Sequence, residues 1–329
     1  MNLNPSSSIL EQVLRGLAGN RQPGWNFPGN FLRLSFDEVE KERSRVSLLA
    51  GPHAVAADGQ LELAALAVLA DIGMAASLRR EVGQARRMAT VQMSLSFMAD
   101  AGPPSGAAPA DLVEACSTAE GATAETGARQ LFTRTAIRHA GRLCCVGGAA
   151  FMPLGGAALA PMPMARRGEP GFEPPLLAEG ELDPAEAGVL ARTRRILAAG
   201  ERNFLARFWD LVPQAGEQRA ACTLENGLHS GNRVGHTQGG IVLALAGHTC
   251  RAAVGADWTL AGISGWYLSP GRGRTLRAEA AILHRGSSTA ACRCEIRDEE
   301  GRLVMHAVSS HVSGPLSGDV SGHVTGQGR

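Results

Sequence analysis

Hydrophobic residues fall into two patterns along the chain, and each pattern occurs twice. Two long runs, residues 61–77 and 239–254, are apolar nearly all round and predict helices that are buried on most faces. Each run is followed by a segment of alternating apolar and polar positions, at 90–98 and 263–270, which predicts a strand with one buried face. The pattern therefore indicates two copies of one structural unit.

Shorter similarities support this repeat. The stretch NFLRLSF begins at Asn30 and NFLARFW begins at Asn203. Strand-like residues 44–51 and 218–227 follow these stretches and precede the apolar runs. A shared IR…GRL pattern, Ile137 to Leu143 and Ile296 to Leu303, predicts a hairpin in each copy. We expect each unit to consist of one strand, one long helix and then four strands.

The remaining segments are predicted to be connections. Residues 153–177 are rich in Pro and Gly and predict a linker. Asp183 and Pro184 then supply an N-cap and a first-turn proline for a helix that runs to about Ala199. The expected organisation is a helix (about 7–17) with its lead-in at 1–29, a first unit at 30–152, the linker and helix at 153–202, a second unit at 203–312 and a disordered tail at 313–329.

Composition excludes several classes of protein. Lys and Arg (32) nearly balance Asp and Glu (31), so no general affinity for nucleic acid or membrane surfaces is expected. We expect a cytoplasmic protein, because the N-terminus lacks a secretory signal and no apolar run is long enough to span a membrane. The seven cysteines show no metal-ligand spacing and are expected to be reduced thiols, with Cys292 and Cys294 on one strand face.

An antiparallel sheet wrapped around one central helix would bury a helix that is apolar on every side. In copy two, the loop that leads into such a helix has the pattern Asn-x-x-Gly-x-x-(His)-Gly-Gly. The residues at the named positions are Asn232, Gly235, Gln238, Gly239 and Gly240. The chain thereby resembles the hotdog fold, and within it the phenylacetate-pathway-type acyl-CoA thioesterases. The later stretches YLSPG and LHRGSSTAACRCEIRDEEGRL also look like that family's strands. The resemblance covers both copies and implies an α+β tandem, or double, hotdog.

The two copies differ in a complementary way. The resemblance places an acid seven residues after the second glycine, where this chain has Gly247. The corresponding residue of copy one is Asp71, but copy one has Ala56 in place of the Asn and residues 62–64 (Glu-Leu-Ala) in place of the family's His-Gly-Gly. The resemblance implies a site between two units, with the loop from one and the acid from the other. We therefore expect Asp71 to serve Gly239 and Gly240, and the reciprocal site to be inactive.

Roles in a thioesterase follow from this arrangement. The N–H of Gly240, with that of Gly239, would polarise the thioester carbonyl and hold the oxyanion. Asp71, on a largely apolar helix, should have a raised pKa that improves it as a general base toward water. Direct attack by Asp71 on the carbonyl is the alternative, and the sequence does not choose between the two.

Three further polar residues belong to the predicted site. Thr90 would orient the water or Asp71, and its counterpart in copy two falls near residues 259–260. Asn232 would position water or the thioester. Gln238 stands where the family usually has His; an amide donates hydrogen bonds but cannot shuttle a proton.

The substrate is expected to be an acyl-CoA, with an acyl carrier protein thioester as the alternative and with no separate cofactor. The coenzyme would lie along the later strands, where backbone and hydroxyl donors could meet its phosphates. The residues predicted for this role are Gly286, Ser287, Ser288, Arg272 and Arg285, with Arg274 nearby. By resemblance, a homodimer of double hotdogs is expected.

Other interpretations remain open at the level of sequence. Asp71 could be an ordinary helix acid reaching solvent, and the two glycines could serve only close packing. His229, His236 and His248 surround the loop in sequence without a metal-ligand spacing, and His248 follows the missing acid as a possible substitute. The competing functions are a hotdog hydratase or dehydratase and a non-catalytic acyl-CoA binding or sensing module.

Overall fold

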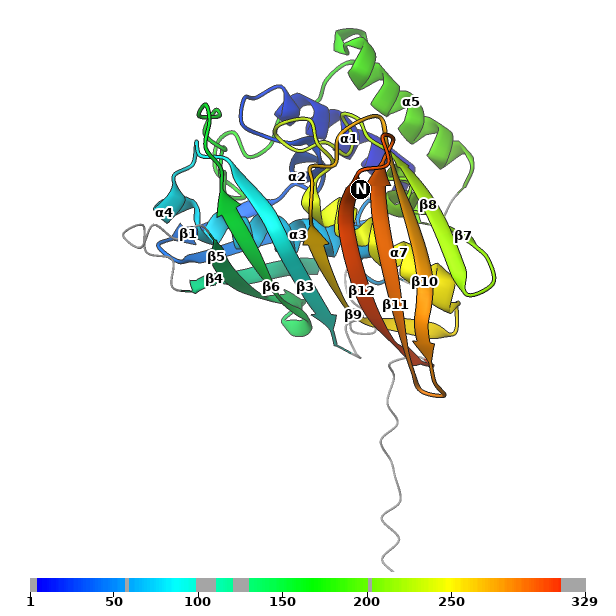
Figure 1. Cartoon of the computed structure of the whole chain (residues 1–329). Helices are drawn as coiled ribbons and strands as arrows, with labels where there is room; N and C mark the ends of the chain where they lie inside the picture. The colour runs from blue at the N-terminus through cyan, green and yellow to red at the C-terminus, as the bar shows by residue number, and fades with distance from the viewer. Residues whose placement is uncertain (1–4, 57–58, 99–110, 121–129, 201–202, 315–329) are drawn as a thin grey trace, which may run out of the picture.

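The computed structural model describes residues 5–56, 59–98, 111–120, 130–200 and 203–314. Its centre is one twelve-stranded antiparallel sheet, which bends around two central helices whose N-terminal halves pack against each other (Figure 1). The strand order is β1-β2-β4-β5-β6-β3-β9-β12-β11-β10-β8-β7. Because every strand of copy one precedes every strand of copy two in this order, each copy forms one half of the sheet.

The first half contains the first central helix. Its elements are α2 (Phe27–Phe31), β1 (Ser35–Glu40), β2 (Arg43–Ala50), α3 (Leu63–Ser77), α4 (Arg79–Val82), β3 (Met88–Phe97), β4 (Asp111–Glu120), β5 (Leu131–His139) and β6 (Arg142–Pro153). Glu62 begins α3 as its N-cap, and its carboxylate accepts a hydrogen bond from the Ala64 N–H.

The second half repeats this order. Its elements are α6 (Phe204–Phe208), β7 (Gln214–Ala215), β8 (Arg219–Glu225), α7 (Gly239–Val254), β9 (Trp258–Tyr267), β10 (Thr275–Arg285), β11 (Thr289–Asp298) and β12 (Leu303–Ser313). The two halves are joined by pairing of β3 with β9, from Gln92 opposite Trp266 to Ser96 opposite Gly262. The tandem hotdog predicted from the repeat is thus the observed fold.

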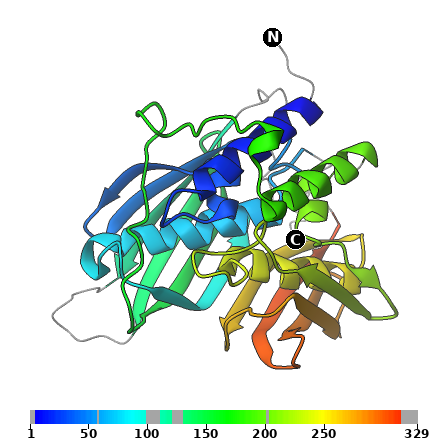
Figure 2. The same cartoon turned by 90° about the horizontal axis from the view of Figure 1, so that it is seen from above.

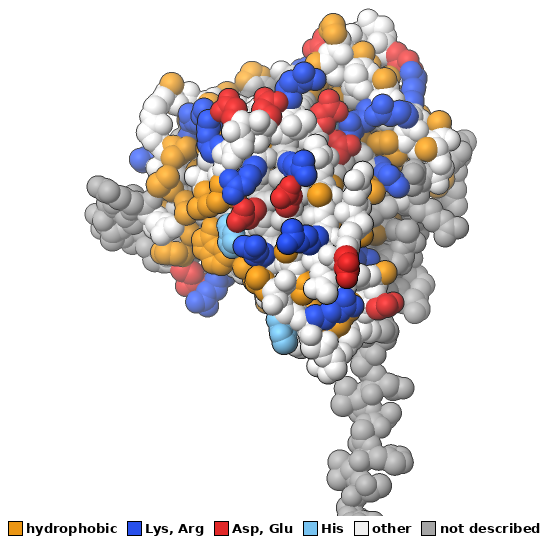
Figure 3. Space-filling model, turned by 45° about the vertical axis from the view of Figure 1, so that its right-hand side comes forward, with side chains coloured by type: hydrophobic (Ala, Val, Ile, Leu, Met, Phe, Trp, Pro, Cys, Tyr) orange, Lys and Arg blue, Asp and Glu red, His pale blue; other side chains and the backbone are white. Residues whose placement is uncertain are grey.

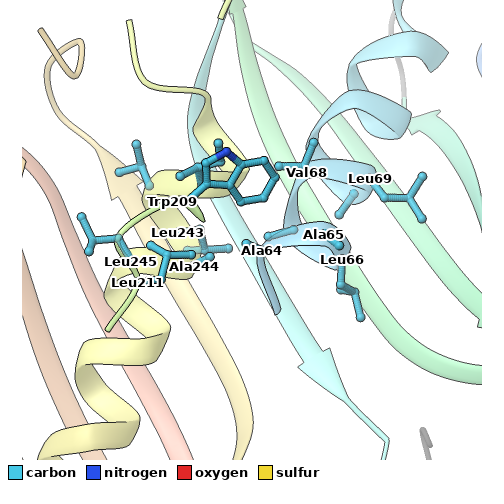
Figure 4. Close-up of a cluster of buried hydrophobic side chains, with 14 of the residues drawn as sticks. Ala64, Ala65, Leu66, Val68, Leu69, Trp209, Leu211, Leu243, Ala244 and Leu245 are labelled. Atoms are coloured by element: carbon cyan, nitrogen blue, oxygen red, sulfur yellow. The ribbon is translucent and has the colours of Figure 1, made fainter. Parts of the chain in front are cut away.

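Each central helix is buried by its own half of the sheet and by the other helix. Thirteen of the fifteen residues of α3 are buried, which explains why its sequence has no polar stripe. Small residues such as Ala64, Ala65 and Ala244 lie between the two helices and allow them to approach closely, with Trp209 covering the junction (Figure 4). The aromatic content of only 4% is consistent with a core built from short side chains.

Two further helices lie on the side of the central helices away from the sheet (Figure 2). They are α1 (Pro5–Asn20) and α5 (Pro184–Ala198), which pack against each other. Asp183 caps α5 by accepting a hydrogen bond from the Glu186 N–H, as the Asp-Pro pair predicted. The linker between the halves contains a short 3-10 turn, Glu179–Glu181.

The sequence analysis was wrong about the number of strands before each central helix. Two strands precede the helix in each half, β1 and β2 in the first and β7 and β8 in the second. β1 was missed because its sequence, SFDEVE, includes three acids and alternates poorly, while β7 has only two residues. Ser313 belongs to β12 and not to the predicted tail, and the tail from residue 315 lies outside the described residues.

The outer face over the second half carries basic and acidic side chains in an interspersed pattern, with hydrophobic side chains gathered to one side (Figure 3). This mixture agrees with the net charge of +1. Within the described ranges, no helix is long and apolar enough to cross a membrane. Cys292 and Cys294 are both buried, as expected for two thiols on one strand face.

Candidate active site

Asp71 lies near the middle of α3 and faces the N-terminus of α7. Its side chain is nearly buried, with 9% of the residue exposed. One carboxylate oxygen, Oδ1, accepts a hydrogen bond of 2.9 Å from Thr90 Oγ1 at the start of β3. The other, Oδ2, accepts one of 2.7 Å from Gln238 Nε2. Two halves of the chain therefore meet at one carboxylate.

Gln238 is the N-cap of α7 and has a fixed orientation. Its Oε1 accepts a hydrogen bond of 3.1 Å from the Ile241 N–H, so its Nε2 is the end that faces Asp71. Exchanging the amide oxygen and nitrogen would place two donors against each other at Ile241 and two acceptors at Asp71. Gln238 consequently supplies a permanent donor to the carboxylate.

The two glycines at the start of α7 are required for different reasons. A Cβ on Gly239 would lie 2.9 Å from Asp71 Oδ2, and a Cβ on Gly240 would lie 2.5 Å from backbone atoms of Ala67. Gly240 thus permits close approach of the two helices, while Gly239 leaves room for the carboxylate. Within the described part of the chain, the Gly239 N–H makes no hydrogen bond, and the Gly240 N–H is directed to Asp71.

Burial raises the pKa of Asp71 to about 6, and the hydrogen bonds from Thr90 and from the Gly240 N–H limit this rise. The sign agrees with the expectation for a carboxyl group on an apolar helix. A carboxylate with this pKa is ionised at neutral pH and is a better proton acceptor than an exposed aspartate. The interpretation of Asp71 as a solvent-facing helix acid is wrong, because the residue is buried.

A cavity of about 690 Å³ opens beside Asp71. Its wall includes Thr90, Gln238, Gly239 and Asn232, so the structure gathers most of the predicted site around one space. Tyr267, which the sequence analysis did not single out, also lines it and donates a hydrogen bond of 2.7 Å to the Gly239 carbonyl. No spacing pattern marks Tyr267; only the fold brings it to the helix start.

Asn232 holds the loop that precedes α7. Its Oδ1 accepts hydrogen bonds from the backbone N–H groups of Val234 and His236, at 3.0 and 3.1 Å. This is an Asx-type turn, in which a side chain organises its own loop. Asn232 therefore has a structural role in addition to its place on the cavity wall.

The residues predicted to bind the coenzyme are not brought together at this cavity. Gly286, Ser287 and Ser288 form the turn between β10 and β11. Arg285 stacks over Trp258, the first residue of β9. Tyr267, the last residue of that ten-residue strand, is about 30 Å away along it. Arg272 alone lies nearby, where its Nε donates a hydrogen bond of 3.2 Å to Nε2 of His236 on the cavity wall.

The reciprocal position of the pseudo-symmetric pair is filled. Glu62, the counterpart of Gln238, contacts His248 at 2.5 Å between Oε1 and Nε2. Gly247, the counterpart of Asp71, has Leu63 in the space a side chain would need: its Cβ would lie 2.6 Å from Leu63 Cδ2. Leu260 occupies the place of Thr90, since a Cβ on Gly247 would lie 3.6 Å from Leu260 Cδ2.

The three histidines around the loop do not form a group. His229 is buried against Phe208, where burial lowers its pKa to about 3, and His236 lies on the cavity wall. His248 is paired with Glu62 at the reciprocal position. Among the described residues, no cluster of His, Cys, Asp and Glu is arranged to hold a metal ion.

Comparison with known proteins supports the fold and its class. Residues 237–305, from the start of α7 into β12, match the model of the thioesterase superfamily. A candidate thioesterase from Novosphingobium aromaticivorans has 16% identity, with 85% of this chain and 98% of that chain covered and a TM-score of 0.52. A candidate oleoyl thioesterase from Lactobacillus plantarum has 10% identity, with 84% and 98% covered and a TM-score of 0.51.

The two structural likenesses extend over both halves and show the double hotdog fold, whereas the family model matches the second half alone. The predicted resemblance to hotdog thioesterases is confirmed, while the narrower phenylacetate-type assignment stays a prediction. No curated protein sequence matches the chain.

Proposed function

We propose that the protein hydrolyses acyl-CoA thioesters at one composite site between its two hotdog units. The observation that carries this proposal is the pair of hydrogen bonds that hold the Asp71 carboxylate beside the free N–H of Gly239 at the start of α7. A base and an oxyanion donor on one cavity wall are the two groups that acyl transfer to water requires. The thioesterase-superfamily match of residues 237–305 supports the same reaction class.

The reaction would proceed by activation of water. Asp71 removes a proton from a water molecule as its oxygen attacks the thioester carbonyl carbon. The N–H of Gly239 donates to the oxyanion of the tetrahedral intermediate, and the N–H of Gly240 joins it once the Asp71 carboxylate has moved away from this N–H. The carbon–sulfur bond then breaks, and the proton held on Asp71 passes to the departing thiolate, which yields a carboxylic acid and free coenzyme A.

Direct attack by Asp71 would instead form a mixed anhydride that water then hydrolyses. Both carboxylate oxygens accept hydrogen bonds, from Thr90 and Gln238, and such bonds reduce the nucleophilicity of a carboxylate. We therefore favour water activation. Single-turnover hydrolysis in ¹⁸O-labelled water distinguishes the two, since label enters Asp71 only when an anhydride forms and is opened at the aspartyl carbonyl.

The activity is tested with a panel of acyl-CoAs while release of free thiol is followed. Wild type should hydrolyse at least one acyl-CoA, and Asp71→Ala and Asp71→Asn should each reduce kcat by about 10²–10⁴-fold, the usual contribution of a general base. Asp298→Asn is a matched control, because Asp298 is also buried but organises the β11–β12 turn.

Two results would contradict the proposal. Equal hydrolysis by wild type and both Asp71 variants would remove Asp71 from the reaction. Binding of acyl-CoA without hydrolysis of any thioester would indicate the non-catalytic module.

A further inference from the structure

Arginines gather on the cavity wall without acidic partners. Arg79, Arg86, Arg87 and Arg233 all line the cavity, and Asp71 is the single acidic residue among the described residues of its wall. None of these arginines has a carboxylate within 4.0 Å in the part of the chain that the structure describes. The cavity therefore has an excess of positive charge.

Arg79 is the most buried member of this group, with 8% of the residue exposed. One of its terminal nitrogens, Nη1, donates to the Arg86 carbonyl at 2.8 Å, but its buried Nε has no hydrogen-bond partner. Burial and the neighbouring charge of Arg233 lower the pKa of Arg79 to about 10. A guanidinium that is buried, unpaired and close to a like charge costs free energy in the empty protein.

Arg233 repeats this arrangement on the other unit. Its Nη2 donates to the Ala160 carbonyl in the linker, and its buried Nε has no partner. Burial lowers the pKa of His236 on the cavity wall, and the nearby charges of Arg272 and Arg87 lower it further, so both charges lie near one imidazole. Positive charge from both halves of the chain thus meets at one side of the cavity.

An anion with several oxygens would relieve this repulsion and satisfy the unpaired N–H groups. Guanidinium groups bind phosphate in a bidentate geometry, and their preference for phosphate is strongest where water is excluded. Arg79 begins α4, beyond the C-terminal end of α3, and the six residues from Asp71 to that end correspond to roughly 9 Å along the helix. The phosphate would therefore lie well away from the carboxylate that acts on the thioester.

We propose that Arg79, Arg87 and Arg233 bind phosphate groups of coenzyme A, so that the protein selects acyl-CoA over acyl carrier protein. This inference rests on the proposed thioesterase function. Coenzyme A has a diphosphate and a ribose phosphate to occupy several arginines, whereas the arm of a carrier protein has one phosphodiester. It also moves the coenzyme site from the β10–β11 turn to the wall formed by α4, β3, the linker and the loop before α7.

The test compares two thioesters of the same acyl group, the acyl-CoA and the phosphate-free acyl-N-acetylcysteamine. Arg233→Ala and Arg87→Ala should each reduce the ratio of kcat/KM for the two substrates by at least tenfold, mainly through KM for acyl-CoA. A variant that merely distorts the site would affect both substrates alike and leave this ratio unchanged. Arg277→Ala is the matched control, because Arg277 is exposed on β10 and pairs with Glu279.

Binding is measured separately from catalysis. Calorimetric titration of the Asp71→Asn protein with coenzyme A, with adenosine 3′,5′-bisphosphate and with inorganic phosphate distinguishes the nucleotide from a free anion. We expect coenzyme A and the bisphosphate to bind, and Arg233→Ala in the same background to weaken both by at least tenfold. If this protein binds coenzyme A but the wild-type protein hydrolyses no thioester, the proposed function is overturned and the phosphate site stands.

Three outcomes would overturn the phosphate site itself. One is an unchanged substrate ratio in both arginine variants. Another is equal affinity for coenzyme A in wild-type and Arg233→Ala backgrounds. The third is faster hydrolysis of an acyl carrier protein thioester than of the matching acyl-CoA by the wild-type protein.

Discussion

Leu63 fills the space beside Gly247 that an acidic side chain would need, as its Cδ2 lies 2.6 Å from where the Cβ of residue 247 would stand. The equivalent positions in the other half are Gly239, which corresponds to Leu63, and Asp71, which corresponds to Gly247. There the glycine begins the helix, and the Asp71 side chain fits against it. At each of the two pseudo-equivalent sites, one of the two residues is therefore large and the other is glycine. One has a carboxylate and a small helix start, and the other has a leucine and a small mid-helix residue.

This packing predicts that an acid cannot simply be restored at Gly247. Gly247→Asp should lower the free energy of unfolding by about 2–4 kcal/mol, because it overfills the space and buries a carboxylate. Gly247→Ala should cost much less, since only the terminal methyl of Leu63 must move. Urea denaturation measures both, and Leu63→Gly added to Gly247→Asp should recover part of the loss. Equal stability of Gly247→Asp and wild type would contradict this account.

Thr90 is predicted to set the acidic limb of the pH–rate profile. Its hydroxyl lowers the pKa of Asp71, so Thr90→Val should move the rise of kcat/KM to higher pH than the value near 6 expected for wild type. Thr90→Ser keeps the hydroxyl and should keep the profile. The measurement is kcat/KM for one acyl-CoA between pH 5 and 8; coincident profiles for the Val and Ser variants would exclude this role.

Asp71 is predicted to make folding stability depend on pH. Its folded pKa, about 6, lies above the ordinary value of 3.8, so the folded state holds the proton more tightly. Stability contributed by the protonated group is present below pH 4 and is lost as pH rises to about 6, at a cost of about 2–3 kcal/mol.

Asp71→Asn removes this dependence while its amide still accepts from Gln238 and donates to Thr90. Relative to wild type, the Asn variant should therefore gain stability between pH 4 and pH 6.5 in urea denaturation. A stability difference that stays constant over this range would show that the carboxyl group titrates normally.

Gln238 is predicted to require a neutral side chain. Gln238→Glu preserves an oxygen for the Ile241 N–H, just as Glu62 caps α3 in the other half. It also places a second carboxylate next to Asp71 Oδ2, which raises the pKa of the pair. The rate at pH 7 should fall at least tenfold and recover in part at higher pH. Gln238→Ala removes one hydrogen bond to the Asp71 carboxylate but adds no charge, so it should shift the profile less than Gln238→Glu does. Equal shifts in the two variants would contradict this explanation.

The repeat pattern predicted the fold because two buried helices and their following strands have strong periodicity. The acid position implied by the family resemblance falls on Gly247 in the second copy and on Asp71 in the first, so the choice of Asp71 needed both the resemblance and the repeat. The first strand of each half was not predicted, because β1 has three acids and β7 has only two residues. At these two edges of the sheet, the alternation of hydrophobic and polar residues is too weak or too short to predict a strand.

The cavity wall was harder to predict for a geometric reason. Arg79, Arg233 and Tyr267 come from segments that share no sequence pattern and meet only in the folded chain. The stretch from Arg285 to Ser288 leads into the β10–β11 turn, and Arg285 lies over Trp258 at the end of β9 away from the cavity. The sequence gives the residue types, whereas the topology of the sheet decides which of them line the cavity.

The pairing of β3 with β9 has a consequence for a chain that contains both halves of the sheet. If the halves were separate polypeptides, each could pair with itself through this edge. A dimer of first halves would then have two acids and no glycine loop, and a dimer of second halves would have two loops and no acid. Covalent linkage holds one first half against one second half, so that Asp71 and the loop before α7 face each other once in each chain.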